Sequence, residues 1–224
     1  MAEDASLSKT KRGESGAAMT QTLSLQEVQR WRKRLLAGAL AGLALLASVS
    51  RADLTLPARA HEALELCGFL FIALAIAGRV WSALYIAGRK KTELVDSGPY
   101  SLSRNPLYLF TFLGTFGVGL QFGGVSFALL ALLFTIAVFR LVVRREEGFL
   151  EEAFGEAYRS YCGRTPRFWP RLSAWKAGRS GGVDRALVLR TFLDASLFLL
   201  AIPLFEAVEY LQESDLLPVL LHLV

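Results

Sequence analysis

The chain has 224 residues, of which 53% are hydrophobic and 20% are charged, and its formal net charge is +5. The apolar residues form long runs, which excludes an ordinary soluble domain and indicates a helical protein that crosses a membrane several times. Two histidines and two widely separated cysteines offer no zinc spacing, no disulfide framework and no histidine-based triad. The basic excess lies beside apolar runs, so we expect contact with lipid headgroups and not with nucleic acid.

The first part of the chain predicts a tail followed by two spans. Residues 1–24 are polar without hydrophobic periodicity, and we expect a disordered cytosolic tail. A basic group then precedes the apolar run Leu35–Ser50, the first predicted span. The second predicted span is Ala63–Gly88. Arg79 lies about two-thirds along it, so its charge should face protein, water or ligand, unless it lies near enough to the interface to snorkel.

A stretch with two prolines follows the second span. Gly98-Pro99 predicts a turn, because proline fixes its own φ and restricts the preceding residue. Pro106 stands where a helix can begin, since the first helical position does not need its N–H. Arg104 and Asn105 are therefore held just outside a membrane helix, which indicates a functional site.

The next apolar run, Leu107–Phe139, carries no formal charge. It is too long for a single crossing of a hydrocarbon core of about 30 Å. The sequence Gln121-Phe-Gly-Gly124 near its middle supplies a turn, so we predict a hairpin of two short or steeply packed helices. Beyond it, apolar residues repeat at helical spacing between residues 149 and 161, which predicts an amphipathic cytosolic helix that ends at Gly163.

The last part of the chain predicts a rigid segment, a linker and a further membrane segment. In Thr165–Pro170, the aromatic residues Phe168 and Trp169 suit the membrane interface. Residues 173–185 contain several glycines and predict a linker. Residues 186–224 predict a C-terminal membrane segment that either crosses once or folds back.

The distribution of Lys and Arg predicts the orientation. Basic residues gather before the first span, after the second span and after the hairpin, whereas only Arg51 and Arg59 lie on the opposite side. An even number of crossings separates these three regions, so we expect all of them, and the N-terminus, in the cytoplasm. The fold class predicted is all-α: a polytopic integral membrane helical bundle of about five transmembrane helices, with its core at residues 25–172.

Five short motifs follow one another within residues 75–170. They are Gly98-Pro-Tyr100, Arg104-Asn-Pro-Leu-Tyr108, Arg145-Glu-Glu147, Phe154-Gly-x-x-Tyr158-x-x-Tyr161 and Thr165-Pro-Arg-Phe-x-Pro170. In this order and spacing the chain resembles the superfamily of isoprenylcysteine carboxyl methyltransferases and phospholipid methyltransferases, in its bacterial integral-membrane form.

The resemblance implies an enzyme of the bacterial inner membrane that binds S-adenosylmethionine on the cytosolic side, at the ends of the hairpin. It implies no metal site. The residues implied in catalysis are Arg104 and Asn105, and those implied in cofactor binding are Tyr100, Asn105, Pro106, Leu107, Tyr108, Glu146 and Glu147. Carboxylates suit the sulfonium, amino group and ribose hydroxyls of this cofactor, and Arg104 suits a carboxylate.

The acceptor stays open, because Asn105 stands where the isoprenylcysteine branch usually has histidine. Asparagine forms hydrogen bonds but does not titrate near neutral pH. The acceptor is expected to be a lipophilic or small carboxylate or thiol compound, with N-methylation of a phospholipid headgroup as the alternative. A non-catalytic membrane scaffold that kept the pocket residues is a further alternative. Membrane lipids are expected partners, and the oligomeric state is not predicted.

Each site residue also has a purely structural interpretation. Glu146 and Glu147 could be the solvated part of a helix, since charge runs usually are. Arg104 could anchor the chain at the membrane interface. Tyr100 and Tyr108 could belong to an aromatic belt.

Overall fold

The computed structural model describes residues 42, 48, 50–52, 58–87, 93–121, 124–178, 184–214, 216 and 221–223. Its elements, in chain order, are β1 (Ser50–Ala52), α2 (Ala58–Ile86), α3 (Pro99–Leu102), α4 (Pro106–Gln121), α5 (Val125–Phe154), α6 (Glu156–Arg164), η1 (Leu172–Ala174), α7 (Arg185–Ser196), η2 (Leu197–Leu200), α8 (Ala201–Glu213) and β2 (Leu221–Leu223). The predicted tail 1–24 lies outside the described residues, as does the predicted first span Leu35–Ser50 apart from isolated positions.

Three stretches in the described part of the chain are long and apolar enough to cross a membrane. They are Arg59–Ile86, Val125–Phe154 and Arg185–Gln212, the last formed by α7, η2 and α8 in succession. The C-terminal segment therefore runs as one long helix over this range and does not fold back within it. The predicted helical membrane bundle is confirmed. The chain is not entirely α-helical, because β1 and β2 pair as two short parallel strands. The predicted total of five spans is not confirmed.

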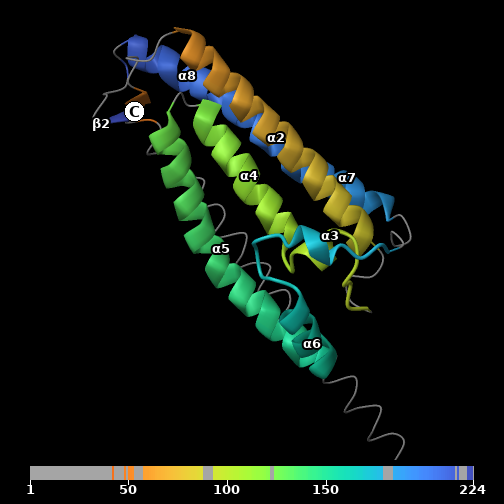
Figure 1. The fold of residues 1–224 in the computed structure, drawn as a ribbon. Coiled ribbons are helices and arrows are strands. Elements are labelled where there is room, and N and C mark those ends of the chain that lie inside the picture. The colour runs from red at the N-terminus through yellow and green to blue at the C-terminus, as the bar shows by residue number, and fades with distance from the viewer. Residues whose placement is uncertain are drawn as a thin grey trace, which may run out of the picture.

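Helices α2, α4 and α5 lie side by side, and α7 lies along α2 (Figure 1). The largest helix contact joins α2 and α4. Its closeness depends on glycine, because a Cβ atom placed on Gly117 would lie 2.7 Å from the carbonyl oxygen of Gly68. Small residues allow such approach of helix backbones within membranes.

The predicted hairpin is confirmed, but its second helix is not short, since α5 has 30 residues, and the charged segment folds differently from the prediction. Helix α5 continues without interruption through the charged residues to Phe154. It ends where Gly155 adopts φ +54°, a conformation that glycine accepts at little cost, and α6 then begins at Glu156. The single amphipathic helix predicted for residues 149–161 is therefore wrong. The reason is that nothing before Gly155 interrupts the helical backbone of the span.

The chain after α6 turns back against the bundle. Phe168 packs on Phe112 with a ring-centroid distance of 5.4 Å, whereas Trp169 is 86% exposed. Part of the predicted linker, residues 173–185, also packs against the bundle. Trp175 stacks on Trp81 with ring centroids 5.9 Å apart. The carbonyl oxygen of Lys176 accepts a hydrogen bond from the N–H of Gly98.

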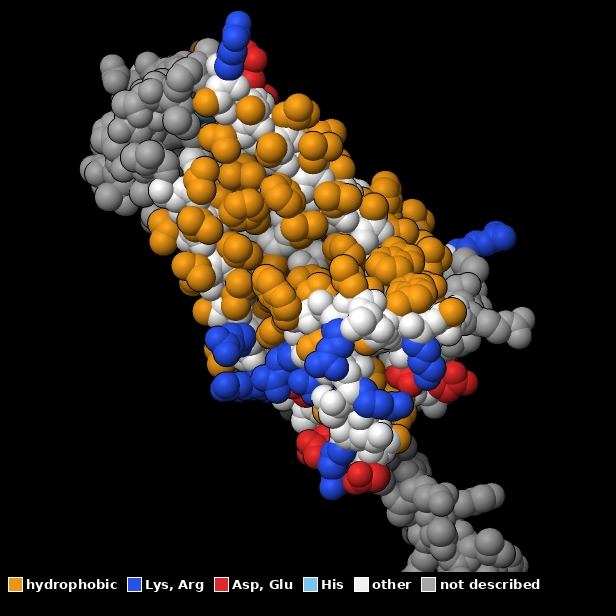
Figure 2. All heavy atoms as spheres, viewed as in Figure 1, with side chains coloured by type: hydrophobic (Ala, Val, Ile, Leu, Met, Phe, Trp, Pro, Cys, Tyr) orange, Lys and Arg blue, Asp and Glu red, His pale blue; other side chains and the backbone are white. Residues whose placement is uncertain are grey.

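The polar and apolar side chains separate along the bundle. Hydrophobic side chains cover the long helices, and most Lys, Arg, Asp and Glu side chains in view gather at one end (Figure 2). This end contains α3, the first turn of α4, the last part of α5, and α6 (Figure 1). The two ends of the hairpin thus meet at one polar face, as predicted.

Candidate functional site

The carboxylate of Glu147 is the centre of the polar end. Glu147 is only 8% exposed. Its Oε1 lies 3.5 Å from Nε of Arg104, and its Oε2 lies 2.6 Å from Nη2 of Arg167. Nδ2 of Asn105 donates to Oε1 across 3.5 Å. A buried carboxylate needs such partners, because burial of an unpaired charge is costly.

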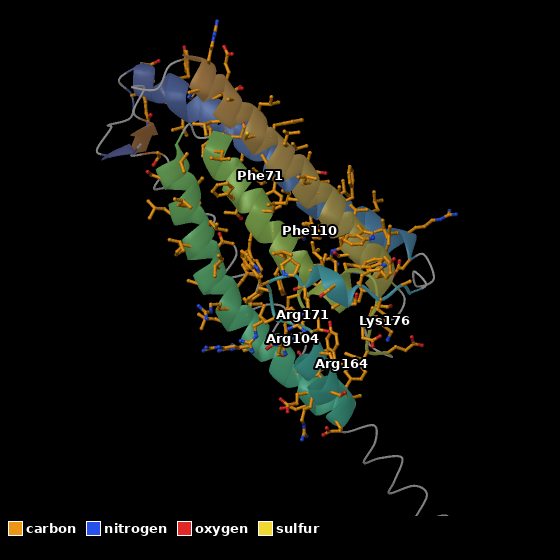
Figure 3. The ribbon with its side chains drawn as sticks, viewed as in Figure 1. Phe71, Arg104, Phe110, Arg164, Arg171 and Lys176 are labelled. Carbon is orange, nitrogen blue, oxygen red and sulfur yellow. The ribbon has the colours of Figure 1, made fainter. Side chains whose placement is uncertain are left out.

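The backbone around Arg104 is held by the segment that follows α6. The N–H of Arg104 donates to the carbonyl oxygen of Pro166 across 2.9 Å. The carbonyl oxygen of Arg167 accepts from Oγ of Ser103 and from Nδ2 of Asn105, both across 3.2 Å. Oγ of Ser103 in turn accepts from the N–H of Asn105. Figure 3 shows Arg104 at this end of the bundle, near Arg171 and Arg164. Residues far apart in sequence therefore form one wall of the site.

Glu146 has its own partner on α4. The hydroxyl of Tyr108 donates to Oε2 of Glu146 across 2.8 Å. The Tyr108 ring is buried against Phe139, with centroids 4.7 Å apart. Because Tyr108 lies in the first turn of α4, this bond joins the two ends of the hairpin.

A pocket opens beside this cluster. Its interior volume is about 70 Å³. The hydroxyl of Tyr100 is buried there and has no hydrogen-bond partner among the described residues. Burial raises the pKa of the Tyr100 phenol, and the charge of Glu146 raises it further, so the hydroxyl keeps its proton and can donate. The lining residues are Ile86, Glu93, Leu94, Val95, Tyr100, Arg104, Leu150, Phe154 and Tyr161.

The remaining predicted residues have structural positions in the described site. Pro106 is buried and begins α4, as predicted. The carbonyl oxygen of Leu107 accepts a hydrogen bond of 3.3 Å from Nη1 of Arg79, which also contacts the hydroxyl of Thr111. Arg79 therefore faces protein within the bundle, the first of the two alternatives. Of the predicted site residues, only Tyr100 and Arg104 line the pocket. The others do not: Asn105, Pro106, Leu107, Tyr108, Glu146 and Glu147.

Two residues at the site were missed as functional candidates. The sequence analysis places Arg167 only within a rigid segment. Its position between two prolines, which hold the backbone around a cation, was the available signal for a functional role. Tyr161 belongs to one of the five motifs but has no predicted role, yet its hydroxyl donates to the carbonyl oxygen of Tyr100 across 2.6 Å. No sequence signal identifies this second contact, because it depends on how α6 packs against α3.

Comparison with known proteins finds one family and two similar resistance proteins. A family model described as phospholipid methyltransferase matches residues 66–157. The nickel-cobalt-cadmium resistance protein NccN of Alcaligenes xylosoxydans xylosoxydans is 38% identical over 157 residues, which is 70% of this chain and 73% of that protein. The cobalt-zinc-cadmium resistance protein CzcN of Cupriavidus metallidurans is 34% identical over 151 residues, 67% of this chain and 69% of that protein. No solved structure matches the chain.

Proposed function

Because the chain belongs to the phospholipid methyltransferase family, we propose that it is a membrane enzyme that transfers a methyl group from S-adenosylmethionine to a lipophilic acceptor. One observation carries this proposal. The Arg104–Tyr108 motif on one end of the hairpin converges with Glu146 and Glu147 on the other end, beside a pocket.

The groups around the pocket suit this cofactor. The buried Tyr100 hydroxyl is a donor that lacks a partner among the described residues, and such a group favours a polar ligand. From the pocket lining, Arg104 offers a cation for a carboxylate, and Glu93 offers an acceptor for an amino group or ribose hydroxyls. Glu146 does not line the pocket, but its charge acts on Tyr100 of the lining, and we assign it as a further acceptor. Glu147 already lies within contact distance of three polar side chains, so we assign it the task of orienting Arg104 and Asn105.

When bound, S-adenosylmethionine would supply an electrophilic methyl group: the acceptor atom would bond to the methyl carbon as the carbon–sulfur bond breaks, and S-adenosylhomocysteine would leave as a neutral thioether. The protein's part is to bind, orient and exclude water, and orientation can account for about 7–11 kcal/mol of the barrier. A carboxylate acceptor is already ionised and needs no base. An amine or thiol acceptor must lose a proton, and Glu146 is the carboxylate we assign to accept it. Asn105 contributes only hydrogen bonds.

A phospholipid amine is the second candidate acceptor, since the matched family is described by phospholipid methylation. The apolar surface of the long helices favours an acceptor that approaches from the bilayer. We propose that the polar end faces the cytoplasm at the inner membrane, because Lys and Arg gather there.

A contribution to metal tolerance is a further part of the proposal, because both relatives are named as metal-resistance proteins. Among the described residues, no group of three His, Cys, Asp or Glu could hold a metal ion. We therefore propose that the protein contributes to metal tolerance by methylating a membrane component. Cells that carry a Glu147→Gln chain should then lose metal tolerance together with methyl transfer.

The test is a calorimetric titration of S-adenosylmethionine into detergent-purified protein, with Glu146→Gln beside the wild type. We expect the wild type to bind and the variant to bind at least tenfold more weakly, about 1.4 kcal/mol. Incubation with labelled cofactor and extracted membrane lipids would then identify the acceptor. A folded wild type that does not bind would favour the non-catalytic scaffold.

A further inference from the structure

We propose that Arg167 is a positioning residue, which holds the Glu147 carboxylate so that Arg104 remains available to an anionic group in the pocket. The inference rests on the proposed function and assigns a role to a residue outside the family match, which ends at residue 157.

The two arginines contact Glu147 unequally. Nη2 of Arg167 lies 2.6 Å from Oε2, the distance of a strong charge-assisted hydrogen bond. Nε of Arg104 lies 3.5 Å from Oε1 and forms no hydrogen bond there. Arg167 is therefore the principal cation for this carboxylate, and its hydrogen bond to Glu147 raises the pKa of its guanidinium. Arg104 is held near Glu147 without being fully engaged by it.

The two arginines also differ in position. Arg104 lines the pocket, whereas Arg167 is not among the lining residues. Glu147 is buried and needs a cation close by. Without the Arg167 guanidinium, Arg104 would be the nearest remaining cation. We expect it to close on the carboxylate and to turn away from the pocket.

The backbone contacts of Arg167 separate this role from folding of the segment. Its carbonyl oxygen accepts from Ser103 and Asn105, and the N–H of Arg104 donates to Pro166. These bonds do not use the Arg167 side chain, so a substitution at this position leaves their donors and acceptors in place.

Arg171 provides a matched control. It is exposed, lies four residues further along the same segment, and its N–H donates to the carbonyl oxygen of Leu102. Arg171→Ala removes the same charge and keeps this backbone bond. No ion pair of its side chain with a described residue is recorded in the structure.

The first experiment measures S-adenosylmethionine affinity by calorimetry in four variants of the full chain. We expect about a tenfold loss in Arg167→Ala, a smaller loss in Arg167→Lys and no change in Arg171→Ala. In Arg167→Ala/Glu147→Gln the affinity should recover in part, because a neutral amide no longer captures Arg104. Unchanged affinity in Arg167→Ala, or no recovery in the double variant, would overturn the inference.

A second experiment does not depend on cofactor binding. The fall in Tm caused by Arg104→Ala is measured in the wild-type chain and in the Arg167→Ala chain. We expect a larger fall in the Arg167→Ala chain, because Arg104 has become the main partner of Glu147. An equal fall in both chains would overturn the inference. A wild type that binds no cofactor, together with a larger fall in Arg167→Ala, would instead contradict only the proposed function.

Discussion

The hydroxyl of Tyr161 donates a hydrogen bond of 2.6 Å to the backbone carbonyl oxygen of Tyr100, and this contact joins α6 to α3. Both side chains are buried, and both line the pocket. Since Arg104 lies two residues after the end of α3, the position of α6 helps to determine the position of the pocket wall. The short helix α6 is therefore part of the site and not only a surface element.

Removal of this bond should destabilise the polar end. Tyr161→Phe keeps the ring but leaves the carbonyl oxygen of Tyr100 without its donor, and an unsatisfied buried group costs about 1–3 kcal/mol. We expect a lower Tm in detergent, measured by circular dichroism. Tyr210→Phe is the control, because Tyr210 is 69% exposed. Equal Tm values in the two variants would contradict this role of Tyr161.

High pH should destabilise the same region. Burial raises the pKa of the phenols of Tyr100, Tyr158 and Tyr161 above the ordinary value. Their contribution to stability is therefore complete below about pH 10, the pKa of an unfolded tyrosine, and is lost as the pH rises towards the folded pKa. Thermal unfolding measured across this range should show a falling Tm. If the buried tyrosines of the folded protein showed phenolate absorbance already at about pH 10, as unfolded tyrosine does, the prediction would be contradicted.

The close approach of α2 and α4 should not tolerate a side chain at Gly117. A Cβ atom there would lie 2.7 Å from the carbonyl oxygen of Gly68 and 2.9 Å from Cβ of Phe71. Gly117→Val should destabilise the bundle by about 1–3 kcal/mol or more, as overpacking does. Gly148 on α5 has nothing within 4 Å of an added Cβ, so Gly148→Ala should stabilise the helix by about 0.5–1 kcal/mol. Denaturant unfolding compares the two, and opposite signs are expected.

The bond between Tyr108 and Glu146 should matter for binding more than for folding. Tyr108→Phe keeps the buried ring against Phe139 and removes only the hydroxyl that donates to Glu146. A hydrogen bond to a charged group contributes about 1.5–3 kcal/mol, and less where water can replace it. We expect about a tenfold loss of cofactor affinity with a small change in Tm. A large fall in Tm with unchanged affinity would make the bond structural.

Much of the fold follows from local sequence. The hairpin of α4 and α5 was predicted because an uncharged run with a central glycine turn has few other solutions in a membrane. Pro106 was predicted to begin a helix because proline lacks an N–H, which the first helical position does not need. The meeting of Arg104 with Glu147 also followed, because both ends of a hairpin must lie on the same side of the membrane.

Tertiary structure decided what local sequence does not contain. The sequence could not show that Arg167 binds Glu147, because the segment that carries it returns to the bundle only through packing of Phe168 on Phe112. Nor could it show where α5 ends, since several charged residues suggested a boundary and a single positive φ at Gly155 supplied it. Helix position and side of the membrane depend on local hydrophobicity and charge, which the sequence determines by itself. Which charges pair in a buried cluster depends on distances between separate segments, and those are determined only when the chain has packed.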